Sequence, residues 1–406
     1  MSRNSKQKTK QISINGSVNR ALESNIESKV ENPPSPLIPN PSHINDQCFH
    51  IVSPLIFSTE LSKLANCQVW LKLENLQPAG SHKVRGIGAY CLRQYNLGIT
   101  QFYCSEGSNS CIATAYIGRQ LECKVTAIVP ENCSKHILAL LKVHHAEILK
   151  YGTSWEDATL QAKTLQMHNP DSCFVSSYDH ADIWEGNKSI ITEIGKQIGD
   201  TPVGGVVLGV GGGGLLSGVV MGMEEAGLEN VPIVAVETHG CNSLQQSVYA
   251  EKILTLQMSN TKAESLAQRR VCSKAFESCF AHPVIPVSVS DNMAANGIVQ
   301  FATQHNMLVE IACGAVLSIV YKQLINDILP NLTQHNALVI VISGGNYTSP
   351  EMVSWFRKKC PNPPVFARSG TKFLMALGET NDENNTNNNG QPSNLNGVNS
   401  KTAGES

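Results

Sequence analysis

Short runs of β-branched residues alternate with helix-length segments along most of the chain. The runs are "VWLKL" (69–73), "VTAIVP" (125–130), "GGVVLGV" (204–210), "VPIVAVE" (231–237) and "ALVIVIS" (337–343). Segments such as "CIATAYIGRQL" lie between them and have the length of helices. Strands that alternate with helices form mostly parallel sheets, because each crossing helix packs on a face of the sheet. The pattern therefore predicts an α/β protein that binds its ligands in loops at the carboxyl ends of strands.

The two ends of the chain lack this pattern. Residues 1–44 are rich in Ser, Asn, Lys and Pro, and residues 373–406 are rich in Asn. Both segments are too polar to form a core, so we expect a disordered arm at one end and a disordered tail at the other. The arm is basic and contains no acidic residue before Glu23. A mitochondrial presequence is therefore the alternative to a plain solvated arm.

Composition narrows the class of partner. The 406 residues include 31 Lys and Arg and 33 Asp and Glu, which give a net charge of −2. This balance does not favour nucleic acid or an anionic membrane, and no apolar run is long enough for a spanning helix, so we expect a small-molecule partner. The 13 cysteines form no C-x-x-C pair. They indicate reduced thiols, and we expect a cytoplasmic protein.

A run of four glycines is the clearest local signal of a ligand. In "VVLGVGGGGLLSGVV", Gly211–Gly214 follow a buried type of strand and precede an apolar segment with the character of a helix. Such a run loses much conformational entropy on folding, so it indicates a backbone that approaches an anion closely at a helix N-terminus. It matches neither the Walker A loop nor the dinucleotide-binding G-x-G-x-x-G motif. We interpret it as a phosphate site, with a flexible strand-to-helix turn as the alternative.

Two further residues fit a site for a phosphorylated aldehyde. "PAGSHKVRG" (78–86) places Lys83 after a Gly-Ser-His turn. A lysine can form an imine with an aldehyde once burial, or a neighbouring cation such as His82 or Arg85, lowers its pKa. The strand 337–343 ends in Ser343, whose hydroxyl can bond a ring nitrogen. Taken singly, an exposed lysine and a turn-forming serine are simpler explanations.

In combination these stretches resemble the L-serine/L-threonine dehydratase (ammonia-lyase) family of fold type II pyridoxal 5′-phosphate (PLP) enzymes, in particular animal-type serine dehydratases. The resemblance runs from about residue 49 to about residue 356. It is carried by "VWLKLENLQPAGSHKVRGIGAYC", "ATAYIGRQLECKVTAIVP", "IWEGNKSIITEI", "GVGGGGLLSGVV", "VAVETHG", "LVEIACGA" and "VIVISGGN".

The resemblance implies a fold and an activity. It implies two domains with open, twisted, mostly parallel sheets covered by helices, and an active site in the cleft between them. The large PLP-binding domain would comprise residues 45–76 and 180–372, and the small domain residues 77–179. The activity would be β-elimination of L-serine, or of L-threonine, to ammonia plus pyruvate or 2-oxobutanoate, in a homodimer.

The resemblance also implies roles for single residues. Lys83 would be the Schiff-base lysine and the catalytic base, and His82 stands where the family usually has phenylalanine. The other cofactor-binding residues would be Asn109 at the 3′-oxygen, Gly211, Gly212, Gly213, Gly214 and Leu215 at the phosphate, and Ser343 at the pyridine nitrogen. Glu237, with Cys241, would contribute to a site for a monovalent or divalent cation.

The loop expected to bind the substrate departs from the family. The family typically reads Ser-Ser/Ala-Gly-Asn-Ala-Gly, whereas residues 105–111 read "SEGSNSC". The substrate residues would be Glu106, Gly107, Ser108, Asn109 and Ser110. A Glu106 carboxylate that faced the carboxylate of the substrate would repel it.

Several interpretations of this loop are open. In the first, Glu106 would point into solvent and the chain would be an active dehydratase. In the second, the substrate would be an amino acid with a cationic side chain. Otherwise the chain binds PLP without catalysis, or it acts as a serine racemase-like enzyme.

Overall fold

The structure, a computed structural model, describes residues 48–106, 108–365, 367–369 and 372–374. The predicted arm (1–44) lies outside the described residues. The predicted tail begins at residue 373 inside a short strand, and from residue 375 onward it also lies outside them.

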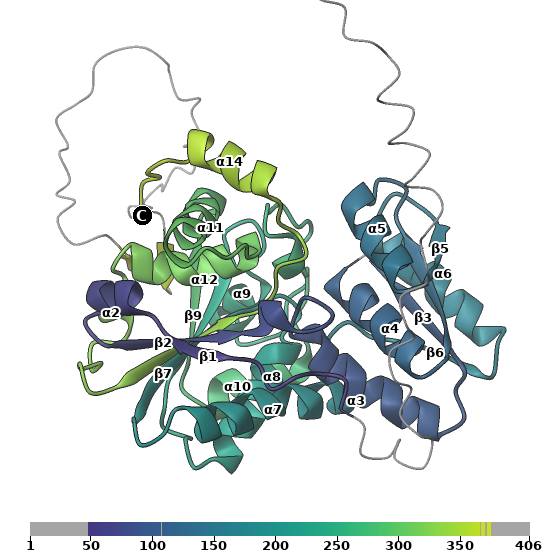
Figure 1. Cartoon of the computed structure of the whole chain (residues 1–406), viewed down its shortest axis with the longest axis horizontal. Coiled ribbons are helices and arrows are strands. Elements are labelled where there is room, and N and C mark those ends of the chain that lie inside the picture. The colour runs from purple at the N-terminus through teal and green to yellow at the C-terminus, as the bar shows by residue number, and fades with distance from the viewer. Residues whose placement is uncertain (1–47, 107, 366, 370–371, 375–406) are drawn as a thin grey trace, which may run out of the picture. The chain divides into compact units, whose positions relative to one another are not determined.

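The larger of two sheets has the strand order β1-β2-β10-β7-β8-β9-β11-β12 (Figure 1). Strands β2, β10, β7, β8 and β9 run parallel to one another, and β1, β11 and β12 pair antiparallel at the two edges. The bounds are β1 Leu55–Phe57, β2 Gln68–Leu73, β7 Val203–Gly209, β8 Ile233–Thr238, β9 Val284–Val289, β10 Ala337–Ile342, β11 Ala367–Ser369 and β12 Lys372–Leu374.

The smaller sheet is parallel throughout and has the order β5-β4-β3-β6. Its strands are β3 Gln101–Ser105, β4 Lys124–Val129, β5 Glu147–Lys150 and β6 Ser172–Phe174. The predicted α/β class with mostly parallel sheets is confirmed, and the five predicted strands agree with the observed ones to within two residues. The predicted domain boundaries stay a prediction.

Helices cover both faces of the larger sheet, as Figure 1 shows. One core joins the sheet to α2 (Thr59–Ala65), α11 (Asp291–His305), α12 (Ile311–Tyr321), α13 (Ile325–Ile328) and α14 (Pro350–Lys359). The other joins it to α7 (Ala181–Gln197), α8 (Gly214–Glu225), α9 (Ser243–Tyr249) and α10 (Ser273–Ala281). Neighbouring strand residues enter different cores, Val207 the first and Val206 the second, because side chains alternate across a strand.

The smaller sheet is covered in the same way. Its main core includes α3 (Lys83–Asn96), α4 (Asn109–Gln120) and α5 (Lys135–Val143), and a second, smaller core includes α6 (Trp155–Met167). Two 3₁₀ turns, η2 (Glu74–Leu76) and η3 (Glu264–Leu266), complete the regular elements of the described chain.

A buried ion cluster fixes the first turn of α3. Arg85 is 1% exposed and donates hydrogen bonds to the carboxylates of Glu74 and Glu193, at 2.7 Å from Nε and from Nη1 respectively. Lys72, on β2, donates to the same Glu193 carboxylate. Buried charges are tolerated only when they are paired in this way, so the cluster holds α3 against β2 and α7.

Candidate active site

A pocket lies where three strands end, and it gathers nearly all the predicted cofactor and substrate residues. Glu106 follows β3, the glycine run follows β7 and Ser343 follows β10, so all three come from carboxyl ends of strands. The predicted residues that line the pocket are His82, Lys83, Glu106, Ser108, Asn109, Ser110, Gly211, Gly212, Gly213, Gly214, Leu215 and Ser343. Gly107 lies outside the described residues.

Lys83 is the first residue of α3, and its side chain points into this pocket. The turn before it needs Gly80, which has φ 69° and lies so close to Asn346 that a Cβ atom would be 2.1 Å from Oδ1. Lys83 Nζ donates a hydrogen bond of 2.7 Å to the carbonyl of Ser177. Burial lowers the pKa of Lys83 to about 8, against the opposing effect of the Glu106 and Glu310 carboxylates. Arg85 faces the buried ion cluster, so burial rather than a neighbouring cation lowers this pKa.

The glycine run forms the turn from β7 into α8. Gly213 has φ 92°, a left-handed conformation that glycine adopts freely. A Cβ atom would lie 2.2 Å from the Tyr178 ring at Gly212 and 2.4 Å from Ala275 Cβ at Gly213. The first N–H groups of a helix have no partner within it, so this turn presents free donors and the positive end of a helix dipole to the pocket. That is the chemistry of a phosphate site.

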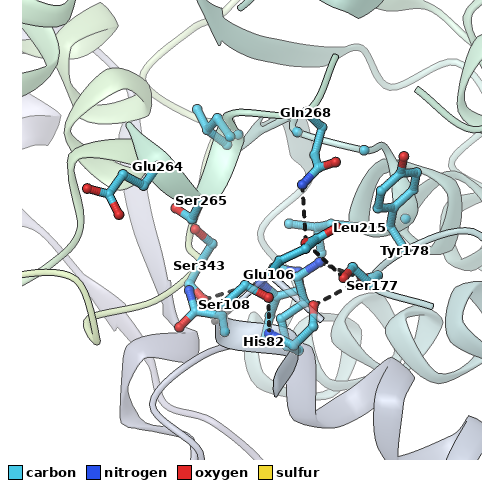
Figure 2. Close-up of a pocket in the computed structure, with 18 of the residues that line it drawn as sticks. His82, Glu106, Ser108, Ser177, Tyr178, Leu215, Glu264, Ser265, Gln268 and Ser343 are labelled. Atoms are coloured by element: carbon cyan, nitrogen blue, oxygen red, sulfur yellow. Dashed lines mark hydrogen bonds between the residues drawn. The ribbon is translucent and has the colours of Figure 1, made fainter. Parts of the chain in front are cut away.

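His82 and Ser343 lie side by side at another wall of the pocket (Figure 2). The backbone N–H of His82 donates to the Ser343 carbonyl at 2.9 Å, and its Nδ1 lies 3.2 Å from the same oxygen. Since a carbonyl only accepts, Nδ1 carries the proton of the imidazole. Burial, together with the nearby Lys83 ammonium, lowers the pKa of His82 to about 3, so the ring is neutral.

Asn109 is fixed by two other side chains. It donates through Nδ2 to Glu310 Oε1 at 2.8 Å, and its Oδ1 accepts from Asn346 at 2.8 Å. One N–H of its amide is left for a ligand in the pocket. Burial raises the pKa of Glu310, which favours its neutral form.

Glu106 lines the pocket instead of turning into solvent, so the placement of its side chain in that interpretation of the loop is wrong. Its Oε2 accepts hydrogen bonds from Ser177 Oγ at 3.1 Å and from Gln268 Nε2 at 3.5 Å. The dashed lines in Figure 2 mark both contacts inside the pocket. Burial raises the pKa of Glu106, with the Lys83 ammonium opposing the shift.

Other residues of the pocket were not predicted from the sequence. They are Trp155, Ser177, Tyr178, Gly209, Glu264, Ser265, Leu266, Gln268 and Glu310. Glu310 lies within "LVEIACGA", one of the stretches that carry the family resemblance, so the sequence does contain a signal for this residue. Ser177, Tyr178 and Gln268 come from irregular segments whose local sequence gives no sign of a site.

Glu237 and Cys241 do not line this pocket. The two Glu237 carboxylate oxygens accept backbone N–H bonds from Leu244 and Gln245, both of 2.8 Å, and burial raises the pKa of Glu237 to about 8. Cys241 Sγ donates to the Gln268 carbonyl at 3.2 Å. Within the described residues, no three His, Cys, Asp or Glu side chains are grouped as metal ligands. The cation site therefore stays a prediction.

The fold and the pocket define an α/β protein with a half-buried lysine beside a helix N-terminus that has the chemistry of a phosphate site. The family described as "Pyridoxal-phosphate dependent enzyme" matches residues 49–344. "Serine dehydratase-like" of Homo sapiens is 38% identical, over 77% of this chain and 96% of that protein. "L-serine dehydratase" of Dictyostelium discoideum is 33% identical, over 74% of this chain and 89% of that protein.

Solved structures agree with these relatives. A fungal L-serine ammonia-lyase from Rhizomucor miehei is 40% identical with a TM-score of 0.74, over 77% of this chain and 100% of that chain. Maize serine racemase, 19% identical with a TM-score of 0.68, over 78% of this chain and 94% of that chain, shares the fold. The chain belongs to the family of pyridoxal-phosphate-dependent enzymes.

The residues present fit PLP. The glycine turn leaves no room for side chains and offers backbone donors to a phosphate. Lys83, with its lowered pKa, supplies an amine for the aldehyde in the same pocket. Ser343 and Asn109 supply uncharged hydrogen-bonding groups for a ring.

Proposed function

We propose that the chain is a PLP-dependent ammonia-lyase that converts L-serine to pyruvate and ammonia, and L-threonine to 2-oxobutanoate and ammonia. The observation that carries the proposal is that half-buried Lys83 and the glycine turn of α8 line the same pocket. Relatives that carry the names L-serine dehydratase and L-serine dehydratase/L-threonine deaminase support the choice of substrate.

Different residues of the pocket would bind different groups of the cofactor. The N–H groups of Gly211–Leu215 would hold its phosphate, Ser343 Oγ would bind its ring nitrogen, and Asn109 Nδ2 would donate to its 3′-oxygen. When bound, PLP supplies an electron-withdrawing ring that eases loss of the α-proton and of the β-hydroxyl from an amino acid. Ser343 carries no charge that would keep the ring nitrogen protonated, which favours elimination over transamination.

Lys83 holds and moves the proton. Its amine has a pKa of about 8, so part of it is unprotonated near neutral pH and accepts the α-proton of the substrate at Nζ. The bond from Nζ to the Ser177 carbonyl fixes the direction of the amine.

A second candidate follows from Glu106, which lies inside the pocket beside Lys83. An ionised carboxylate there repels the α-carboxylate of serine. If this repulsion prevents serine from binding, the chain binds PLP without turning serine over. A serine racemase-like enzyme is the other alternative on the same scaffold.

The products formed by purified, PLP-loaded protein separate these functions. With L-serine, the ammonia-lyase forms equal amounts of pyruvate and ammonia. The racemase forms D-serine instead, and the binding protein forms neither. Pyruvate without ammonia, or no product at any pH, contradicts the proposal.

The compartment and the assembly belong to the same proposal. We place the protein in the cytoplasm as a homodimer. The 13 cysteines all lie in the described part of the chain as free thiols, which supports a reducing compartment. Within the described residues, no helix has the length and apolar character needed to cross a membrane. Sedimentation equilibrium and fractionation of cells test the two statements.

A further inference from the structure

The side chains that line the pocket include more acidic groups than basic ones. Glu106, Glu264 and Glu310 bring three carboxyl groups, and Lys83 is the one cation among the described lining residues. Burial raises the pKa of all three carboxyl groups. A cofactor phosphate and a substrate carboxylate add further negative charge, while the cofactor engages the Lys83 amine. The pocket can bind these anions together only if some of its carboxyl groups carry protons.

Glu106 is the carboxyl group placed to meet a substrate. Both Glu106 and Lys83 contact Ser177, Glu106 through its Oγ and Lys83 through its carbonyl. In an amino acid the carboxylate and the amine share one carbon, so a substrate whose amine reaches Lys83 brings its carboxylate close to Glu106. Ser108, Asn109 and Ser110 line the same region, at the N-terminus of α4, which also favours an anion.

The carboxyl group of Glu106 is held in place rather than free to swing away. Its Oε2 is occupied by Ser177 Oγ and Gln268 Nε2. The Gln268 backbone is anchored in turn, because its carbonyl accepts from Cys241 Sγ and from Ser243 Oγ, both at 3.2 Å. The Glu106 backbone has φ 87°, a left-handed conformation that disfavours a side chain. Backbone strain at a residue whose carboxyl group is anchored inside a pocket is consistent with a functional position.

We propose that Glu106 binds the substrate's α-carboxylate as a neutral carboxylic acid, so that an amino acid and one proton enter the pocket together. Oε2 keeps its two donors, and the hydroxyl at Oε1 donates to the carboxylate. The proton comes from solvent, and no covalent bond changes. This inference rests on the proposed function, and it makes affinity for the substrate fall as pH rises through the pKa of Glu106.

Several other ionisable groups face Glu106 or the Lys83 amine and contribute to this titration. They are Lys83 on α3, Cys104 on β3, Glu156 on α6, Tyr178 before α7, Glu264 on η3, Cys272 before α10, Glu310 before α12 and Tyr347 after β10. The test therefore compares proteins that differ at Glu106 alone.

Calorimetry of L-alanine binding to the PLP-loaded protein tests the inference. Alanine has the amine and the carboxylate of serine but no β-hydroxyl to eliminate. Titrations from pH 6.5 to 8.5, in buffers with different heats of ionisation, give the number of protons taken up. Above the pKa of Glu106, wild type should take up about one proton more per alanine than Glu106→Gln, and its Kd should rise about tenfold more per pH unit.

Three further proteins complete the experiment. Glu106→Ser, which also lacks the titrating group, should match Glu106→Gln. Glu156→Gln removes a nearby charge that pairs with Arg269 outside the pocket, and it should keep the proton uptake of wild type. Lys83→Ala should abolish the alanine signal.

The outcomes separate this inference from the proposed function. Equal proton uptake by wild type and Glu106→Gln overturns the inference, even if serine is converted to pyruvate. Loss of alanine binding in Glu106→Gln at every pH also overturns it, because it means that an ionised carboxylate is required, as for a cationic ligand. Failure to form pyruvate at any pH, with the predicted proton uptake intact, counts against the proposed function and leaves the role of Glu106 in binding supported.

Discussion

Two turns lead from strands into helices at this pocket, one before α8 and one before α4. Each contains a residue with a left-handed backbone, Gly213 with φ 92° in the first and Glu106 with φ 87° in the second. Glycine adopts this conformation without strain, whereas glutamate does so at a cost of about 1–2 kcal/mol. The first turn offers only backbone groups to a ligand, and the second adds a titratable side chain.

The comparison separates the two tasks of the pocket. In the proposed assignment the turn before α8 binds a phosphate, which is an anion at every relevant pH, so a fixed set of N–H donors suffices. In the same assignment the turn before α4 binds the substrate, and its carboxyl group would make that binding depend on protonation. The glycine run, Lys83 and Ser343 lie in one pocket, as the resemblance predicts, and most of the departures from the family's sequence lie in the substrate loop.

The largest effect is expected at Lys83, where the two turns meet. Lys83→Ala removes both the amine that holds the cofactor and the base, so turnover of L-serine should fall by at least about a thousandfold. The visible absorbance of bound PLP should also be lost. Lys63→Ala, at an exposed position on α2, is the control and should retain both signals. Turnover by Lys83→Ala within tenfold of wild type would refute the assignment of the base.

Gly213→Ala tests the turn that lacks side chains. The new methyl group would lie 2.4 Å from Ala275 Cβ on a backbone with φ 92°. Strain and overpacking together should lower the free energy of unfolding by about 3 kcal/mol and weaken binding of PLP. Urea denaturation and titration with PLP measure the two effects.

Gly227→Ala is the matched control at the other end of α8. Gly227 has φ 70°, and no neighbouring group lies within 4 Å of the place that the new methyl group would take. This variant should therefore lose only about 1 kcal/mol of stability and bind PLP normally. Equal losses in the two variants would show that backbone strain alone, without the close packing at Gly213, explains the effect.

Glu106→Ser tests the turn with the carboxyl group. At pH 8, where Glu106 is more often ionised than at lower pH, the serine variant should raise kcat/KM for L-serine by about tenfold, because it removes a net cost of about 1.4 kcal/mol for bringing the substrate carboxylate to Glu106. The gain should shrink as pH falls and wild-type Glu106, whose pKa burial raises, takes up its proton. Steady-state kinetics at several pH values measure it, and a gain that grows as pH falls would contradict the account of this turn.

The smallest effect is expected at His82, where the cofactor side departs from the family. His82→Phe loses the bond from Nδ1 to the Ser343 carbonyl, so at pH 7.5 it should be about 1 kcal/mol less stable than wild type. The pKa of His82 is about 3 in the folded chain and near 6.5 when unfolded, so the unfolded chain binds more protons between these values. Wild type should therefore lose up to about 1.4 kcal/mol per pH unit below pH 6.5 through this residue, and the variant should not.

Urea denaturation at pH 7.5 and at pH 5 measures how the stability difference between wild type and His82→Phe changes with pH. The variant should be less stable than wild type at pH 7.5 and at least as stable at pH 5. A difference that stays constant between the two pH values would show that His82 titrates normally in the folded chain.

The difference between the two turns also explains what the sequence could predict. The strands follow from local runs of β-branched residues, and the glycine run marks a phosphate site because its signal is contained in four consecutive residues. The sequence identifies Glu106 as unusual for the family, but it does not predict which way the side chain points. Its orientation depends on Ser177, 71 positions away, and on Gln268, 162 positions away, and neither stretch has a local pattern.

The sequence could not predict the pKa values either, because they also depend on residues that are far apart in the chain. Arg85 stands two residues after Lys83 and was a natural candidate for the cation that lowers its pKa. It lies instead in the buried ion cluster with Glu74 and Glu193. Burial, which only the packing of distant segments creates, is the dominant cause at Lys83, His82 and Glu106.

Chemical mapping of the cofactor tests most directly whether Lys83 and the glycine turn form one PLP site. The PLP-loaded protein is reduced with sodium borohydride, digested, and searched by mass spectrometry for a lysine that carries the pyridoxyl group. We predict the modification on the peptide that contains Lys83, and its loss in Gly213→Ala protein at limiting PLP. Modification of another lysine, or of none, would contradict the assignment of this pocket.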